Sequence, residues 1–338
     1  MTIRTGLIGY GLGGAVFHAP LIRSCPLLSL EAVATRRAVP EGLRAVSDPQ
    51  ALIADPAIDL IVISTPNASH FPLAMAALEA GKHVVVDKPF AASAEQADRL
   101  IALAHERDRR LTVFHNRRWD GDFLTVRELL ASGRIGEVML CEMHWDRFRL
   151  ALRPGWKDEA AEGTGLLYDL GSHLIDQALV LFGAPERISG DLAVQRSGAA
   201  VDDYFALTFH YGPRRVILSA STLVAAPRPR FALYAKGGSL VKFGIDPQED
   251  QLKTGLRPDE PGYGEEPQRL HGIITLPDGG CERIPTLGGL YPEYYRRVAA
   301  AIAEGAPVPI EPADARLGLA IIEAARQSAE QGCAVEIG

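Results

Sequence analysis

Cysteine is sparse in this 338-residue chain, and its spacing argues against the structures that cysteine usually builds. The four cysteines, at positions 25, 141, 281 and 333, lie far apart and form no Cys-x-x-Cys pair. This spacing disfavours both a disulfide framework and a zinc site, so we expect reduced thiols and no bound metal.

The chain also lacks a long apolar run and an excess of basic residues. No apolar stretch approaches the ~20 residues of a membrane-spanning helix, and glycine interrupts the N-terminal segment MTIRTG too early for a signal peptide. The 42 acidic residues outnumber the 35 basic ones, which argues against a general nucleic-acid binder. We therefore expect a cytoplasmic protein with no membrane or nucleic-acid partner. The length suggests about two domains.

The first 115 residues predict a parallel sheet covered by helices. Short apolar runs alternate with helical stretches, a pattern typical of a doubly wound α/β (Rossmann) domain, which we place at residues 1–118. Ser93-x-x-Gln96 has the spacing of a capping box at the start of one helix. The expected strands span residues 3–9, 28–34, 60–64, 83–86 and 111–114, and the expected helices span 13–24, 48–54, 70–80 and a stretch from 93.

After residue 118 the pattern predicts an α+β domain, which we place at residues 119–338. Several β-rich runs follow one another with little helix between them, as in a large, mainly antiparallel sheet. Residues 246–267, rich in Pro, Gly, Asp and Glu, are expected to form a surface loop. The expected helices cover 122–132, 166–182, 291–304 and 312–332, and the expected strands cover 137–148, 188–196, 204–211, 216–223 and 231–235.

A glycine-rich turn follows the first expected strand and opens the first expected helix. Its sequence, GYGLGG at residues 9–14, contains G-x-G-x-x-G. Gly9 permits a tight turn, Gly11 lets the backbone approach a pyrophosphate, and Gly14 allows the helix to pack closely on the strand. The position at the start of a βαβ series favours a dinucleotide site, including Leu12, over a glycine-rich turn without a ligand.

The end of the second expected strand favours NADP over NAD. An NAD site usually has an acid there that binds the ribose 2′-hydroxyl. The nearest acid, Glu31, lies in mid-strand, and the strand ends at Thr35, Arg36 and Arg37. Arginine is a charged, bidentate partner for phosphate, so we predict that these three residues bind the 2′-phosphate of NADP. A solvated basic turn is the alternative, and NAD remains possible.

Lysine is scarce, with six in the chain, and one of them lies where a ligand is expected. Lys88 follows an apolar strand in Asp87-Lys88-Pro89, and open α/β sheets bind ligands outside the carboxyl ends of their strands. A lysine there can exchange a proton with a substrate hydroxyl. Taken alone, the motif would be read as an exposed lysine at a turn.

Five segments together resemble one family over nearly the whole chain. They are residues 9–14 (GYGLGG), 65–70 (TPNASH), 81–89 (GKHVVVDKP), 116–118 (NRR) and 169–173 (DLGSH). This set resembles the glucose–fructose oxidoreductase/inositol dehydrogenase (Gfo/Idh/MocA) family. The segments FHAPLI and NRRWD are more narrowly similar to the branch with the NADP-dependent scyllo-inositol 2-dehydrogenases. Asp87 departs from the family pattern, which more often has the longer Glu.

The resemblance implies roles for individual residues. Lys88, Asp169 and His173 would be catalytic and would bind the substrate. Asp169 and His173 also lie four residues apart on one expected helix, where a carboxylate can orient an imidazole, although a surface pair is the alternative. Trp156 is a candidate wall of the substrate pocket, with plain packing as the alternative. The expected cofactor contacts are Thr65, Pro66, Asn67, His70, Asp87, Lys88, Asn116 and Arg118.

The sequence therefore predicts an NADP-dependent oxidoreductase that moves a hydride between the nicotinamide and a secondary alcohol of a cyclic polyol or sugar. In oxidation, His173 or Lys88 would take the hydroxyl proton while Asp169 holds His173. An aldose or keto-sugar oxidoreductase of the same family is one alternative. A non-catalytic regulator that senses NADP or a sugar is another. The resemblance also implies a homodimer or homotetramer, with a subunit covering one face of the C-terminal sheet.

Overall fold

The computed structural model describes residues 2–152 and 159–337, and the chain divides into two compact units. The first unit comprises Met1–Trp119, Gln248–Tyr263 and Leu290–Leu319. The second comprises Asp120–Pro247, Gly264–Gly289 and Ala320–Gly338. Each unit is therefore assembled from three separate segments of the chain.

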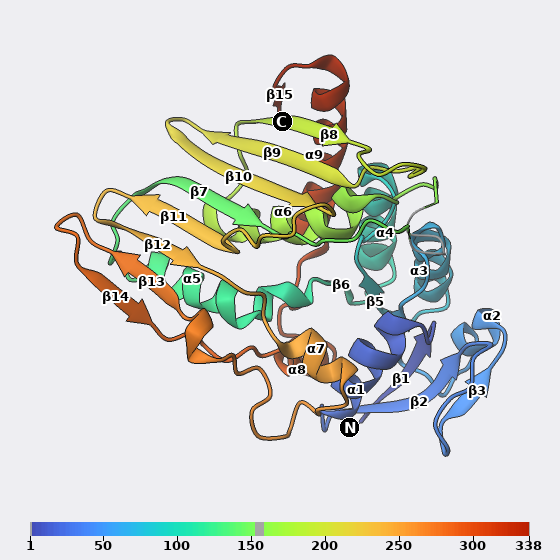
Figure 1. Cartoon of the computed structure of the whole chain (residues 1–338). Helices are drawn as coiled ribbons and strands as arrows, with labels where there is room; N and C mark the ends of the chain where they lie inside the picture. The colour runs from blue at the N-terminus through green and yellow to red at the C-terminus, as the bar shows by residue number, and fades with distance from the viewer. Residues whose placement is uncertain (1, 153–158, 338) are drawn as a thin grey trace. The chain divides into compact units, whose positions relative to one another are not determined.

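The first unit is built on a six-stranded parallel sheet, counted within the described residues, in the order β3-β2-β1-β4-β5-β6 (Figure 1). Its core strand β4 is buried at every position, as expected when helices cover both faces. The strand order reverses between β1 and β4, where doubly wound sheets bind their ligands. The elements of this unit are β1 (Ile3–Ile8), η1 (Gly13–His18), α1 (Ala19–Arg23), β2 (Leu28–Ala34), β3 (Arg44–Val46), α2 (Pro49–Ile53), β4 (Leu60–Ile63), η2 (Asn67–Ser69), α3 (His70–Glu79), β5 (His83–Asp87), α4 (Ala94–Glu106), β6 (Leu111–Phe114), η3 (Asn116–Trp119), α7 (Gln248–Lys253), α8 (Pro292–Ala303) and the first part of α9 (Pro312–Gln331).

Local signals in the sequence explain several of these boundaries. The Ser93 side chain accepts a hydrogen bond from the Gln96 backbone N–H at 3.2 Å, while the Gln96 side chain accepts one from the Ala92 N–H at 3.2 Å. The capping box expected at the start of α4 therefore forms in a slightly shifted version. Helix α3 stops just before Gly81, whose φ of +74° suits glycine at a helix end.

The second unit is built on a nine-stranded sheet, again counted within the described residues, in the order β14-β13-β12-β11-β7-β10-β9-β8-β15. Every neighbouring pair is antiparallel except β7 and β10, which run parallel. The elements are α5 (Gly121–Ala131), β7 (Val138–His144), η4 (Leu167–Gly171), α6 (Ser172–Phe182), β8 (Arg187–Ala193), β9 (Tyr204–Tyr211), β10 (Arg214–Ser221), β11 (Phe231–Ala235), β12 (Gly238–Lys242), η5 (Gln268–Leu270), β13 (Gly272–Thr275), β14 (Cys281–Ile284), the rest of α9 and β15 (Val335–Glu336).

The register of this sheet places one row of apolar side chains across its inner face. Each member pairs directly with the next across neighbouring strands, and each is at most 1% exposed. Alternate residues point to opposite faces of a sheet, so the row marks the core side. The row consists of Ile274, Leu240, Leu233, Cys141, Val216, Phe209 and Ile188.

Some boundaries differ from the sequence-based expectations. The segment 246–267, expected to be a loop, contains the short helix α7. The strand expected over 137–148 ends at His144, and the strand expected over 188–196 ends at Ala193. The helices expected over 13–24 and 166–182 each begin with a π-helical turn, η1 and η4, before continuing as α-helix. The strands β3, β12, β13, β14 and β15 were not expected, because each is too short to show a clear hydrophobic pattern.

None of the helices formed by residues 2–152 and 159–337 is both long and apolar enough to cross a membrane.

Candidate functional site

The glycine-rich loop between β1 and η1 combines tight packing with one open position. Gly9 has a φ of +98°, and a Cβ there would lie 2.1 Å from the Ser64 carbonyl oxygen. A Cβ at Gly14 would lie 2.1 Å from the Gly9 oxygen. At Gly11, by contrast, no heavy atom of the described residues lies within 4 Å of a Cβ position, and the neighbouring Leu12 is 57% exposed. Positions 9 and 14 therefore require glycine for packing. Gly11 leaves open space through which a pyrophosphate can reach the backbone. The loop thus fits a dinucleotide.

The carboxylate of Asp87 lies directly beneath this loop, at the end of β5. A Cβ on Gly13 would lie 3.0 Å from its Oδ2. The carboxylate accepts hydrogen bonds from the Lys88 backbone N–H at 2.8 Å and from the Ser64 hydroxyl at 3.1 Å. His18 Nε2 lies 3.4 Å from the same carboxylate. The loop, the end of β4 and the end of β5 therefore meet at one carboxylate.

A buried histidine supports Asp87 from behind. The His18 side chain is fully buried, and its Nδ1 hydrogen-bonds the Tyr295 hydroxyl at 2.6 Å. Burial alone would raise the pKa of Asp87, but the hydrogen bond from His18 and the electrostatic interactions with His18, His70 and Lys88 outweigh it and hold the pKa at about 2. Asp87 is therefore ionised at neutral pH.

His70 connects the loops that follow β4 and β5. Its Nδ1 lies 2.8 Å from the Pro89 carbonyl oxygen and its Nε2 lies 2.9 Å from the Thr65 carbonyl oxygen. The side chain is fully buried, and burial lowers its pKa. Both ring nitrogens face backbone carbonyl oxygens, so His70 ties the two loops together. Lys88, the first residue of the loop after β5, is half-buried.

The other cofactor candidates after β4 have mixed exposure. Pro66 is exposed, Thr65 is half-buried, and Asn67 is 8% exposed. The Thr65 hydroxyl receives a hydrogen bond from the Ser69 hydroxyl at 2.8 Å, which closes the turn that leads into α3.

The three residues after β2 lie on the surface beside the strand that carries the glycine-rich loop. β2 pairs with β1, and Arg36 and Arg37 are both exposed. The Thr35 backbone N–H donates to the Val46 carbonyl, and the Arg37 N–H donates to the Thr35 hydroxyl at 3.0 Å. This turn fixes the backbone and leaves the two guanidinium groups facing water.

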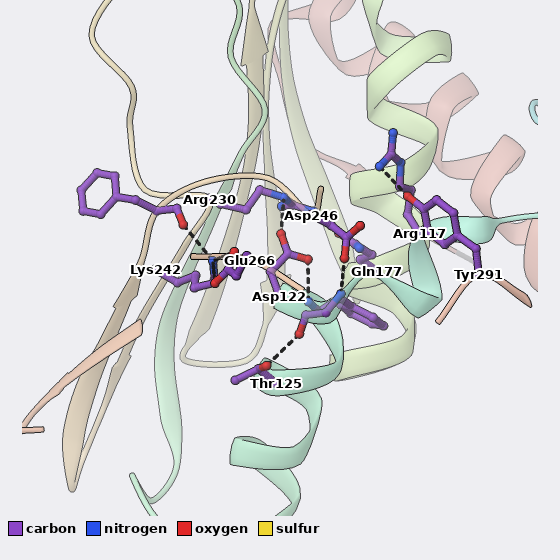
Figure 2. A network of polar contacts seen from close by, with 12 residues as sticks. Arg117, Asp122, Thr125, Gln177, Arg230, Lys242, Asp246, Glu266 and Tyr291 are labelled. Atoms are coloured by element: carbon purple, nitrogen blue, oxygen red, sulfur yellow. Dashed lines mark hydrogen bonds and ion pairs between the residues drawn. The ribbon is translucent and has the colours of Figure 1, made fainter. Parts of the chain in front are cut away.

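The segment Asn116–Trp119 is anchored in part by two residues that the sequence did not single out, Glu249 and Asp314. Asn116 is 5% exposed. Arg117 donates to the Tyr291 hydroxyl at 2.6 Å (Figure 2). Arg117 also forms an ion pair with Glu249 of α7. Arg118 pairs with Asp314 at 3.1 Å. No sequence signal marked Glu249, because it lies in the segment that was expected to be a loop.

Glu249 is held in its charged form by this pairing. Burial would raise its pKa, but Arg117 and Lys253 lower it to about 2. An ionised carboxylate in a buried position needs such partners, since desolvation of an isolated charge is costly.

In the second unit, Asp169 and His173 occupy consecutive helical segments. Asp169 is half-buried in the π-helix η4, and His173 is 5% exposed in the first turn of α6. The start of η4 is fixed by Asp202, whose carboxylate accepts a hydrogen bond from the Leu167 N–H at 2.7 Å. Gly165, with a φ of +105°, is required there because a Cβ would lie 2.2 Å from the Asp202 carboxylate.

Two further residues contact or lie near His173: Trp145, which the sequence offered only as a candidate pocket wall or packing residue, and Arg230, which it did not single out. The ring of Trp145 stacks on the His173 imidazole, with centroids 5.8 Å apart and an interplanar angle of 28°. The Arg230 guanidinium lies over the Trp145 ring, 4.9 Å from its centroid. Such contacts join distant parts of the chain, so spacing in the sequence gives no sign of them.

Two further predictions concern Trp156 and bound metal. Trp156, the candidate pocket wall, lies outside the described residues. Within the described ranges, no group of three or more His, Cys, Asp or Glu side chains is arranged to hold a metal ion.

Comparison with known proteins decides the family. A model described as the NAD-binding Rossmann fold of an oxidoreductase family (GFO_IDH_MocA) matches residues 3–115, and the model of that family's C-terminal alpha/beta domain matches residues 127–337. The chain belongs to the Gfo/Idh/MocA oxidoreductase family. The family and the fold class predicted from the sequence are thus confirmed. As a Gfo/Idh/MocA member, the chain is an oxidoreductase with an NAD(P)-binding Rossmann domain.

Similar proteins span nearly the whole chain. It is 45% identical over 336 residues to the uncharacterized oxidoreductase YdgJ of Escherichia coli, covering 97% of this chain and 96% of that protein. It is 38% identical over 339 residues to the scyllo-inositol 2-dehydrogenase (NADP(+)) IolW of Bacillus subtilis, covering 98% of this chain and 94% of that protein. The solved structure of the oxidoreductase yvaA from B. subtilis has a TM-score of 0.96 at 37% identity and covers 100% of this chain and 99% of that one.

Proposed function

We propose that this Gfo/Idh/MocA member is an NADP-dependent dehydrogenase acting on a secondary alcohol of a cyclic polyol or sugar of the scyllo-inositol type. The observation that carries the proposal is the set of acid–base groups: Lys88 at the end of β5, and His173 on α6 with Asp169 just before it. A regulator that only senses a ligand has no chemical need for this set. The similarity to IolW, named for an NADP-dependent reaction of this type, supports the substrate class.

We propose that the cofactor binds at the carboxyl ends of the parallel strands of the first unit. Gly9, Gly11 and Gly14 shape the cradle for the pyrophosphate. The bound cofactor would supply the hydride acceptor for oxidation of the substrate, or the hydride donor for the reverse reaction. Residues after β1, β4 and β5 and in η3 are proposed to hold the rest of the dinucleotide; they are Leu12, Thr65, Pro66, Asn67, His70, Asp87, Lys88, Asn116 and Arg118.

The protein's own contribution is proton transfer and orientation. In the oxidation direction, His173 or Lys88 takes the proton of the substrate hydroxyl, and in reduction the same group returns it. Asp169 orients the imidazole and stabilises its charged form. Asp87 acts on proton transfer indirectly. Its carboxylate accepts a hydrogen bond from the Lys88 N–H and so fixes the backbone that carries the lysine.

The preference for NADP is proposed from the turn after β2. Arg36 and Arg37 are exposed there, and no acid of this turn replaces them, since residues 35–40 read Thr-Arg-Arg-Ala-Val-Pro. A guanidinium forms charge-assisted, bidentate hydrogen bonds with a phosphate. Thr35 can add its hydroxyl to the same group.

We further propose that the protein works as a homodimer or homotetramer through the outer face of the nine-stranded sheet. Half-exposed apolar side chains, including Val241 and Ile217, lie on that face. A sheet face of this kind is stable when it is covered.

The experiment that tests the function follows absorbance at the nicotinamide band with NADP⁺ and NAD⁺ over a panel of inositols and aldoses. We expect reduction of NADP⁺ with scyllo-inositol and little reduction of NAD⁺. Turnover only with a different sugar would replace the proposed substrate and keep the mechanism. Tight NADPH binding with no turnover on any compound would favour the sensing regulator.

The role of Lys88 is tested by Lys88→Ala. We expect this variant to bind NADPH while its turnover falls by about 10²-fold or more, the contribution typical of a proton-transfer group. NADPH binding, measured by fluorescence titration, is the control. Near-wild-type turnover would remove Lys88 from the mechanism.

A further inference from the structure

The imidazole of His173 rests against a buried aromatic ring. Trp145 immediately follows β7 and is 2% exposed, and its ring stacks on His173 with centroids 5.8 Å apart. The Trp145 backbone N–H donates to the Ser219 carbonyl on β10 at 3.0 Å, which fixes the main chain at that point. The plane of the indole therefore sets the plane in which the imidazole can lie.

The indole is in turn fixed by a buried arginine. The guanidinium carbon of Arg230 lies 4.9 Å from the Trp145 ring centroid and 4.3 Å from that of Phe231. The Arg230 side chain is 1% exposed. A cation over an aromatic ring is held more strongly in such a desolvated place than at an exposed one. Rotation of the indole would break this contact.

Arg230 is anchored to two helices, one of which carries His173. It donates to the side-chain oxygen of Gln177 on α6, and its Nε lies 3.6 Å from Asp122 Oδ2 on α5 (Figure 2). Gln177 and Asp122 are both fully buried. Because Gln177 follows His173 by four residues, the two side chains lie one turn apart on the same face of α6.

These contacts connect His173 back to its own helix. His173 stacks on Trp145, and Trp145 lies against the Arg230 guanidinium. Arg230 hydrogen-bonds Gln177, which lies one turn after His173 on α6. We propose that Trp145 and Arg230 are positioning residues that hold the His173 imidazole in the orientation needed for proton transfer. This proposal rests on the proposed function, since it takes His173 as a proton-transfer group.

The cost of burying Arg230 supports a role beyond packing. A buried ion pair is often no more stabilising than apolar side chains of the same size. Asp122 and Gln177 compensate the desolvation of the guanidinium but do not explain why a cation is used at all. A cation lying on an indole fixes both the distance and the plane of the ring, which an aliphatic side chain does not.

The kinetic test compares Trp145→Leu with Trp145→Phe. Phenylalanine keeps a ring for stacking, so Trp145→Phe is expected to retain turnover within about threefold. Trp145→Leu is expected to lower kcat by about tenfold or more, because small misplacements of a reacting group are costly. KM for NADP⁺ is expected to stay unchanged in both. Equal losses in the two variants, or no loss in Trp145→Leu, would overturn the proposal.

A double-mutant cycle separates positioning from general damage. If Trp145 acts through the imidazole, Trp145→Leu lowers kcat by no more than about twofold in a His173→Ala background. An additive loss in that background would contradict the proposal. Phe209→Leu is the matched control, because Phe209 is an equally buried aromatic residue of the same sheet. It is expected to leave kcat near that of the unmodified protein.

A spectroscopic test does not depend on turnover. The chain has nine histidines, and the ring signal of His173 in a histidine-labelled proton–carbon spectrum is the one lost in His173→Ala. We expect that signal to move in Trp145→Leu, through loss of the indole ring current, and to stay in place in Phe209→Leu. Arg230→Lys keeps the charge but not the planar group, and it is expected to move the signal in the same direction.

The two proposals can fail separately. Absence of turnover in the unmodified protein would refute the proposed function, and the spectrum would still decide whether Trp145 and Arg230 position the imidazole. A His173 signal that stays in place in Trp145→Leu overturns the positioning role of Trp145. A signal unmoved in Arg230→Lys overturns that of Arg230.

Discussion

Gly9 and Gly11 stand two residues apart and meet opposite surroundings. Gly9 is pressed against the Ser64 carbonyl in a backbone conformation that favours glycine, whereas Gly11 faces open space. The first glycine is therefore needed by the fold, and the second by whatever approaches the loop. A methyl group at each position should separate stability from binding.

We predict that Gly11→Ala keeps the thermal unfolding midpoint within a degree or two of the original and weakens NADPH binding by about tenfold, or 1.4 kcal/mol. Gly9→Ala should instead lower the midpoint, because its Cβ collides with backbone. Calorimetry and a fluorescence titration of NADPH measure the two effects. Unchanged affinity in Gly11→Ala would show that no ligand approaches that side of the loop.

Residue-level prediction from the sequence succeeded where a short motif carries its own geometry. Gly9 and Gly14 are tightly enclosed as the motif requires, and Lys88 lies at the end of its strand. It failed where the partners are far apart: His18 and Tyr295 lie 277 positions from each other. Spacing rules describe one turn or one strand, and they contain no information about which distant side chain fills the space behind a carboxylate.

At the scale of elements, α7 illustrates how composition misleads. Its surroundings are rich in Pro, Gly and acids, which favour turns, so residues 246–267 were expected to form a loop. The six-residue helix forms nevertheless, and its Glu249 pairs with both Arg117 and Lys253. A helix this short is marginal alone and depends on such tertiary contacts.

We predict that Glu249→Gln destabilises the protein by about 3 kcal/mol at pH 7, since the partner Arg117 stays buried without its counter-charge. The folded pKa of about 2 lies below the ordinary 4.5. The stabilisation is therefore complete above about pH 5 and is lost as pH falls from there toward 2.

Thermal unfolding midpoints of the two proteins should accordingly converge as the pH falls through that window. Glu79→Gln is the control, because Glu79 is exposed at the end of α3. A difference between Glu249→Gln and the original that stays constant down to pH 2 would contradict an ionised, paired Glu249.

At the scale of the whole molecule, the nine-stranded sheet has two unlike faces. The inner row that contains Val216 and Leu233 is fully buried. The next row includes half-exposed Val241 and Ile217, together with Ile273, which is 40% exposed. An alternation of apolar and polar residues would leave the outer face to water. Here apolar residues occur on both faces.

We predict that light scattering gives the mass of a dimer or tetramer and that Ile217→Glu lowers it, because a carboxylate at the centre of a covered face would be desolvated. NADPH binding should persist, since Ile217 lies outside the unit that carries the glycine-rich loop. Leu27→Glu, a change of the same kind at a residue 41% exposed in the first unit, is the control. A monomer in the unmodified protein would refute the oligomer.

The sequence predicted both sheets but not how the chain is shared between the units. Alternating strands and helices identified the parallel sheet, and the run of β-rich segments identified the antiparallel one. The later segments of the first unit carry no signal of where they return, because hydrophobic periodicity shows which face of a helix is buried and not against what. Tyr295 on α8 and Ile310 before α9 are examples; they contact His18 and Thr112.

This discontinuity has a consequence for how the protein is made. A ribosome releases the chain from its N-terminus, at roughly 5–20 residues per second. All strands of the parallel sheet have been synthesised once β6 has emerged. Tyr295, which hydrogen-bonds His18, and Ile310, whose carbonyl accepts from Thr112, follow almost 200 residues later. The first unit therefore reaches its final packing only after α8 and the start of α9 have also emerged. Until then the side chains that these segments cover, His18 and Thr112 among them, lack their final partners.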